Sequence, residues 1–136
     1  MSAKLLVDTS AWIVSFRKAG HEPLKKTLVS ALDSFSVVTT NIVILELLQG
    51  CRNRNEYEAM HSRLNALETI PVDDAVWGLA YTTGYDLRRK GITVSTVDII
   101  IAAAAKVHGC GLLHHDKHFR PLAKHLHLNA VDYIDE

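Results

Sequence analysis

The chain has 136 residues, 48% of them hydrophobic, and its 15 basic and 15 acidic residues give a formal net charge of zero. This size fits one compact domain over residues 1–136, and the charge balance excludes nucleic-acid binding through a strongly basic surface. No apolar run approaches the roughly 18 to 20 residues of a membrane span, and the first residues do not resemble a secretion signal. We therefore expect a cytoplasmic protein with no membrane partner. Cys51 and Cys110 lie far apart and are predicted to be free thiols.

Short apolar or β-branched segments alternate with amphipathic segments along the whole chain. This alternation predicts an α/β fold, a three-layer α/β/α sandwich with a mainly parallel central sheet. Asn41 is expected to cap the helix that follows it, and Trp12 and Trp77 are expected in the core or on a dimer face. In chain order, the predicted elements are a strand over 3–8, helices over 9–20 and 22–34, a strand over 35–40, helices over 42–50 and 55–68, a strand over 69–72, helices over 73–91 and 95–109, a strand over 109–115, a helix over 119–127 and a strand over 129–134.

Four acidic residues lie in or beside segments predicted to be buried, where a charged side chain is unfavourable. Asp8 ends one predicted strand and Asp116 follows another, and ligands of open parallel sheets gather outside the carboxyl ends of the strands. Glu46 lies in "IVILELLQ" and Asp98 in "STVDIIIAAAA", where an unpaired buried carboxylate is costly. If the four converge, their repulsion raises their pKa values unless divalent cations hold them ionised. Oxygen ligands of this kind suit Mg²⁺ or Mn²⁺ better than zinc.

Each acid also has a structural interpretation, which the sequence leaves open. Asp98 lies three residues after Ser95, and the pair fits a capping box. Asp8 fits the cap of the next helix, and Asp116 fits a turn residue. For Glu46 the alternative is an ion pair with an arginine, and the chain offers Arg17, Arg52 and Arg88.

Four segments, "LLVDTSAWI", "ILELLQG", "VSTVDIIIAAAA" and "LLHHDKHF", resemble in order and spacing the four acidic motifs of the PIN-domain ribonucleases. The small size and the last motif are most similar to the VapC-like toxins of type II toxin–antitoxin pairs. The resemblance implies a Mg²⁺- or Mn²⁺-dependent endoribonuclease that forms a homodimer and is inhibited by a small antitoxin protein. It assigns the catalytic and metal-binding roles to Asp8, Glu46, Asp98 and Asp116.

The same resemblance suggests accessory residues around the acids. Ser10 is the small hydroxyl residue two positions after the first acid, and His115 and His118 flank the last one. His118 is also a departure from the family pattern, because many relatives carry a further acid at this position. Basic residues next to the motifs are candidates for contacts with RNA phosphates; they are Arg52, Lys117 and Arg120.

Other functions fit the sequence less well. A phosphatase of the haloacid dehalogenase type needs a second aspartate where the chain has Ser10, and a receiver domain needs paired acids at the first strand. Five histidines between positions 114 and 127 suggest a zinc site, but no cysteine or HExxH pattern accompanies them. The main alternative is a non-catalytic PIN-like module that binds RNA or protein.

Overall fold

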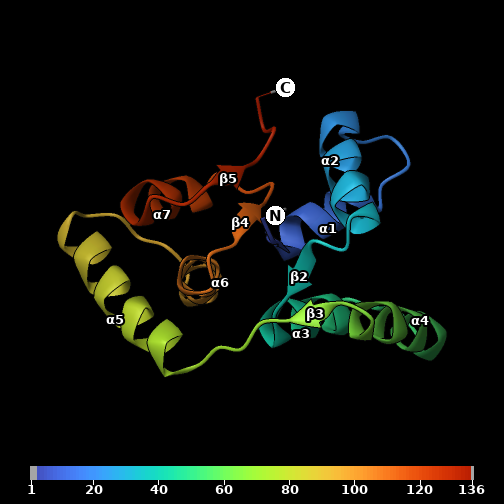
Figure 1. Cartoon of the computed structure of the whole chain (residues 1–136), viewed down its shortest axis with the longest axis horizontal. Helices are drawn as coiled ribbons and strands as arrows, with labels where there is room; N and C mark the ends of the chain where they lie inside the picture. Colours follow the sequence, from blue (N-terminus) through green and yellow to red (C-terminus); the bar gives the residue numbers. More distant parts are fainter. Residues whose placement is uncertain (1–2, 136) are drawn as a thin grey trace.

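A computed structural model describes residues 3–135. Its centre is one sheet of five parallel strands in the order β3-β2-β1-β4-β5 (Figure 1). Every neighbouring pair of strands is parallel, so the predicted parallel α/β sandwich is confirmed. The strands are β1 (Leu5–Val7), β2 (Val37–Thr39), β3 (Glu68–Thr69), β4 (Gly111–Leu113) and β5 (Ala130–Val131).

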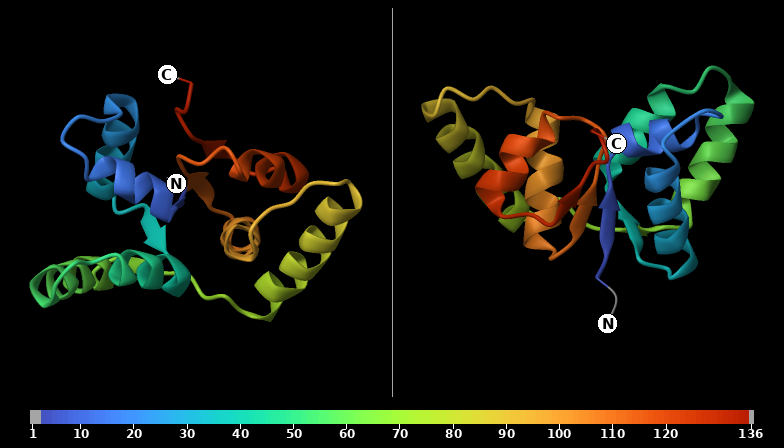
Figure 2. Two further views of the ribbon diagram at one scale, coloured as in Figure 1. Left: turned by 180° about the vertical axis from the view of Figure 1, so that it is seen from behind. Right: turned by 90° about the horizontal axis from the view of Figure 1, so that it is seen from above.

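Helices cover both faces of the sheet (Figures 1 and 2). Helices α1 to α4 lie on one face, and α5 to α7 lie on the other. This division follows from right-handed crossovers, because the chain moves outward from β1 to β3 and then returns to β4 and β5. The helices are α1 (Thr9–Ser15), α2 (Glu22–Asp33), α3 (Asn41–Gln49), α4 (Arg54–Asn65), α5 (Asp74–Arg89), α6 (Thr96–Val107) and α7 (Phe119–Leu126).

The strand order reverses at the centre of the sheet, between β1 and β4. These strands are in register from Leu5 with Gly111 to Val7 with Leu113. The backbone amide of Asp8 extends the pairing by donating to the carbonyl of Leu113 at 2.9 Å. In open α/β sheets, the crevice at such a reversal, outside the carboxyl ends of the strands, is where ligands bind.

Helix α6 is closely packed in its layer. Its residues 100–105 are all buried, and the four alanines 102–105 are completely so. Small side chains let this helix approach its neighbours closely, and it contacts both α5 and α7. Asp98 lies two residues before the buried run, so its backbone position is fixed by a rigid part of the core.

Two local predictions are wrong. Thr40 caps α3 in place of Asn41: its hydroxyl accepts from the Val43 amide at 3.2 Å, while Asn41 is already helical. The strand predicted over 69–72 is instead β3 at Glu68–Thr69, one residue earlier and shorter, and Pro71 has no amide to extend it.

The tryptophans and cysteines occupy different environments. Trp12 is buried on α1, whereas Trp77 on α5 is 38% exposed. Cys51 and Cys110 are free thiols, as predicted. None of the helices within residues 3–135 is both long enough and apolar enough to cross a membrane.

Candidate active site

The four acids selected from the sequence come from four segments around the carboxyl ends of β1 and β4. Asp8 follows β1 directly, and Asp116 lies three residues beyond β4. Glu46 comes from α3 on one face of the sheet and Asp98 from α6 on the other. The charges of Asp8, Asp116 and Glu46 all act on Asp98, so the fold gathers the four into one group, here called the acidic cluster.

Asp8 is the most enclosed member of the acidic cluster, with 4% of its surface exposed. Its Oδ2 accepts from the amide of Ser10 at 2.9 Å and from the hydroxyl of Ser10 at 2.6 Å, so the predicted role as cap of α1 is confirmed. Burial raises the pKa of Asp8 and the charge of Glu46 adds to this, which outweighs the bonds from Ser10. Asp8 therefore carries a buried charge in addition to its capping role.

Ser10 joins the two central strands at the site. Its hydroxyl donates to Asp8 and accepts from the amide of His115 at 2.9 Å. The segment after β1 is thereby tied to the segment after β4, which carries Asp116.

Glu46 is met by a hydroxyl and not by an arginine. The Thr9 hydroxyl donates to Glu46 Oε1 at 2.8 Å, which links the start of α1 to α3. Arg52 instead pairs with Glu56 at 3.1 Å, and within residues 3–135 no arginine lies within ion-pair distance of Glu46. Thr9 was not predicted from the sequence, although its position between Asp8 and Ser10 was a signal.

Asp98 has the largest pKa shift of the four acids. Its pKa is raised to about 6, because burial and the charges of Asp8, Asp116 and Glu46 outweigh a hydrogen bond with Ser95 that lowers it. The Ser95 hydroxyl caps α6 by accepting from the Asp98 amide at 3.1 Å. The reciprocal bond of a capping box, from the Ser95 amide to the Asp98 carboxylate, does not occur in the described structure. The carboxylate itself is therefore not explained by capping.

Asp116 is held by the histidine two residues after it. Oδ1 accepts from the His118 amide at 2.9 Å and lies 2.7 Å from His118 Nδ1. Burial raises the pKa of Asp116, but these bonds and the His118 charge outweigh burial and lower it overall. The expectation that crowding raises every pKa in the cluster is therefore wrong for Asp116.

The segment around Asp116 contains two residues that the sequence analysis did not select. His114 is almost completely buried, and its Nδ1 accepts from the Asp116 amide at 3.3 Å. Asp132, after β5, accepts through its backbone carbonyl from His115 Nδ1 at 3.0 Å. The histidine count in "HHDKHF" was a signal for His114, but nothing in the sequence pattern pointed to Asp132.

Two of the three basic candidates are engaged in ion pairs. Arg120 binds Asp132 at 2.9 Å and Asp135 at 3.1 Å, and Arg52 binds Glu56. Lys117 is exposed next to Asp116. Of the three, Lys117 is the one without an ion pair in the described part of the chain.

The acidic cluster fits a divalent cation in chemistry, although its side chains are not arranged around one. Within residues 3–135, no group of three or more His, Cys, Asp or Glu side chains is positioned to hold a metal ion, which also gives no support to the zinc interpretation. The donors are carboxylate and hydroxyl oxygens, the ligands that Mg²⁺ and Mn²⁺ prefer. The pKa of Asp98 is raised first by burial and then by the neighbouring carboxylates, and a bound cation would oppose both effects.

A family model of the PIN domain matches residues 5–125, a span that contains all four acids. The chain belongs to the PIN domain family. Two curated PIN relatives are 30% identical to it: VapC ribonuclease Mb1587 of Mycobacterium bovis, over 95% of this chain and 98% of the relative, and ribonuclease VapC21 of Mycobacterium tuberculosis, over 90% and 88%.

Solved structures show the same PIN fold at lower sequence identity. VapBC2 from Rickettsia felis, bound to a promoter DNA fragment, superposes with a TM-score of 0.77 at 16% identity, over 94% of this chain and 97% of that one. FitAcB from Neisseria gonorrhoeae gives a TM-score of 0.72 at 18% identity, over 94% and 96%. The PIN fold predicted from the four motifs is therefore confirmed, while the roles of individual site residues stay predictions.

Proposed function

We propose that this PIN domain is a Mg²⁺- or Mn²⁺-dependent endoribonuclease that acts in the cytoplasm as the toxin of a toxin–antitoxin pair. The proposal is carried by the acidic cluster: four segments supply one carboxylate each at the strand reversal, and burial together with the charges of the other three acids raises the pKa of Asp98 to about 6. Curated relatives named VapC ribonucleases support the same chemistry.

The proposed roles follow from the bonds at each acid. Asp8, Glu46, Asp98 and Asp116 would hold the cation, which would polarise phosphate oxygens and activate water for hydrolysis. Ser10 and Thr9 keep Asp8 and Glu46 oriented without adding charge. Lys117 contacts the RNA phosphate nearest Asp116.

The test is cleavage of labelled RNA by the purified protein with Mg²⁺, with Mn²⁺ and with a chelator. We expect cuts only with the divalent ions, products with 5′-phosphate and 3′-hydroxyl ends, and no cleavage by Asp116→Asn. Asp33→Asn, an exposed change on α2, is the matched control and should cleave normally. RNA that is bound but never cut would replace this proposal with the non-catalytic binding module.

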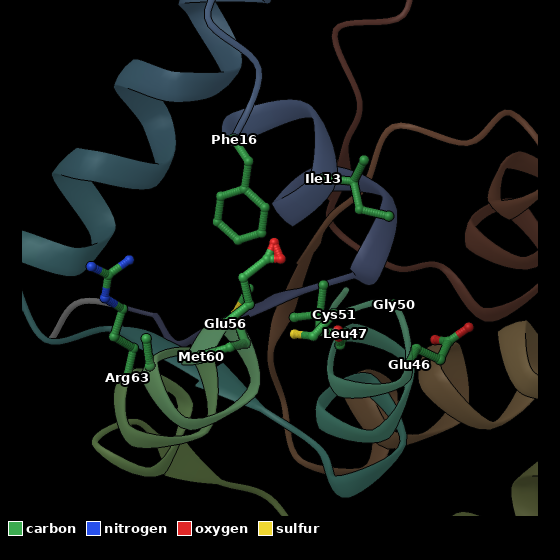
Figure 3. Close-up of a pocket in the computed structure, with 10 residues that line it drawn as sticks. Ile13, Phe16, Glu46, Leu47, Gly50, Cys51, Glu56, Met60 and Arg63 are labelled. Carbon is green, nitrogen blue, oxygen red and sulfur yellow. Dashed lines mark hydrogen bonds between the residues drawn. The ribbon is translucent and has the colours of Figure 1, made fainter. Parts of the chain in front are cut away.

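The antitoxin is proposed to bind beside the acidic cluster. An open pocket of about 340 Å³ lies between α1, α3 and α4, and Glu46 is the member of the acidic cluster that borders it. Figure 3 shows Ile13 on α1 and Phe16 just after it on one side of the pocket, across from Leu47, Glu56 and Met60. These apolar walls suit an apolar side chain of a peptide that continues over the acids.

A pocket variant tests this location. Ala59→Trp fills the pocket from α4 and should weaken inhibition by the purified cognate antitoxin without changing RNA cleavage by the free toxin. Unchanged inhibition would exclude this pocket as the docking site.

Homodimerisation is proposed through α5. Trp77, Tyr81 and Tyr85 repeat every four residues and are 38%, 71% and 64% exposed. Aromatic side chains of this kind are enriched in protein interfaces, and a second copy of the chain offers the same stripe for packing.

A further inference from the structure

His114 occupies an unusual place for a polar side chain. It is 1% exposed, and its ring lies 5.0 Å from the ring of Phe119 on α7. It directly follows β4, where its backbone amide donates to the carbonyl of Val131. A buried imidazole at this point needs partners for both ring nitrogens, because an unpaired buried polar atom is costly.

One nitrogen is used to hold the loop that carries Asp116. Nδ1 accepts from the backbone amide of Asp116 at 3.3 Å. An accepting Nδ1 carries no proton, so the proton of the neutral ring lies on Nε2. Burial favours this neutral form, since it lowers the pKa of His114 against the opposing charges of Asp132 and Asp8.

The other nitrogen faces the C-terminal segment. Nε2 lies 3.9 Å from Asp132 Oδ2, beyond direct hydrogen-bond distance but close enough for electrostatic attraction. Asp132 is itself fixed, because its carboxylate accepts from Arg120 at 2.9 Å and from the Ile134 amide at 3.1 Å. The segment after β5 thus supports the segment after β4.

We propose that His114, supported by Asp132 and Arg120, is a positioning residue that fixes the backbone of Asp116 and so aims its carboxylate into the acidic cluster. The inference rests on the proposed role of Asp116 as a metal ligand. It gives Arg120 a task different from the RNA contact suggested by the sequence. Groups that orient metal ligands typically change metal affinity by about 10- to 100-fold when they are removed.

Three variants separate positioning from packing. Asn Oδ1 lies the same number of bonds from the backbone as His Nδ1, so His114→Asn keeps the acceptor but leaves a void beside Phe119. His114→Leu and His114→Phe fill the space but remove the acceptor. Packing alone therefore predicts that Asn is the worst replacement, whereas positioning predicts that it is the best.

The first measurement is hydrogen exchange of the Asp116 amide in the metal-free protein, followed by NMR. The second is Mn²⁺ affinity by calorimetry, with Asp116→Asn beside the three variants. We expect faster exchange and about 10- to 100-fold weaker Mn²⁺ binding in the Leu and Phe variants, with Asn close to wild type in both. Melting temperatures are recorded alongside to rank the packing effect.

The outcomes are distinguishable. Asp116 exchange that is unchanged in the Leu and Phe variants, or Asn behaving as badly as both, would overturn the positioning role. If exchange rises as expected but Asp116→Asn keeps full Mn²⁺ affinity, the positioning of the loop stands and the proposed metal-ligand role of Asp116 fails.

Discussion

Asp98 stands at the start of a helix whose following residues are alanine and isoleucine, and its charge has an energetic consequence. Its folded-state pKa of about 6 is above the ordinary 3.8, so the folded state binds this proton more tightly than the unfolded state. The stability that this provides is present at low pH and is lost as the pH rises through 6. At neutral pH, the ionised carboxylate therefore opposes folding in the absence of metal.

Replacing Asp98 by asparagine should remove that penalty. In metal-free buffer at pH 7.5 we expect Asp98→Asn to raise the melting temperature by roughly 2–6 °C, and the difference should vanish near pH 4. Mn²⁺ should stabilise the wild type and leave the variant almost unchanged. Thermal scans by circular dichroism provide the measurement, and a lower melting temperature for the variant at pH 7.5 would mean that Asp98 is structural.

Ser10 makes two bonds that no other residue in the site replaces. Ser10→Ala removes the donor to Asp8 and the acceptor for the His115 amide, which should cost about 1–3 kcal/mol of unfolding free energy. Ser15→Ala is the matched control, because its hydroxyl makes one bond within α1, to the Trp12 carbonyl. Urea unfolding of both variants measures the two losses of unfolding free energy. Equal losses would mean that Ser10 does not join the two strands.

At the scale of elements, the cap of α3 matters because this helix carries Glu46. Thr40→Ala should destabilise the protein by about 1 kcal/mol, whereas Asn41→Ala should have little effect, since Thr40 provides the capping hydroxyl. Chemical denaturation of the pair tests the assignment. A larger loss from Asn41→Ala would restore the cap expected from the sequence.

The sequence predicted the elements well but not all of their ends. Alternation of apolar runs with amphipathic segments was enough for the sheet and its helices, because each element has its own hydrophobic period. The cap of α3 was misplaced because Thr40 and Asn41 are both good capping residues and only backbone conformation separates them.

The residues of the candidate site could also be predicted only in part from the sequence. The acids were visible because a carboxylate in an apolar helix or at a strand end is unusual. Thr9 and His114 had only weak signals in the sequence and Asp132 had none, because each acts through a contact that only the folded chain creates.

For the whole molecule, the aromatic stripe on α5 leads to a prediction about assembly. The wild type should sediment as a dimer, and Tyr81→Glu should give a monomer because it places a charge in the centre of the stripe. Tyr57→Glu on α4 changes a tyrosine outside the stripe and should remain dimeric. A monomeric wild type at micromolar concentration would contradict the proposed interface.

The central claim is that four segments distant in sequence build one cation site. Calorimetric titration of Mn²⁺ into the purified, antitoxin-free protein tests this claim most directly, with Asp98→Asn, Asp116→Asn and the surface control Asp33→Asn titrated in parallel. We predict that the wild type and Asp33→Asn bind Mn²⁺ alike and that both site variants bind it much more weakly. Binding that neither site variant weakens, or no binding by the wild type at millimolar Mn²⁺, would contradict the account.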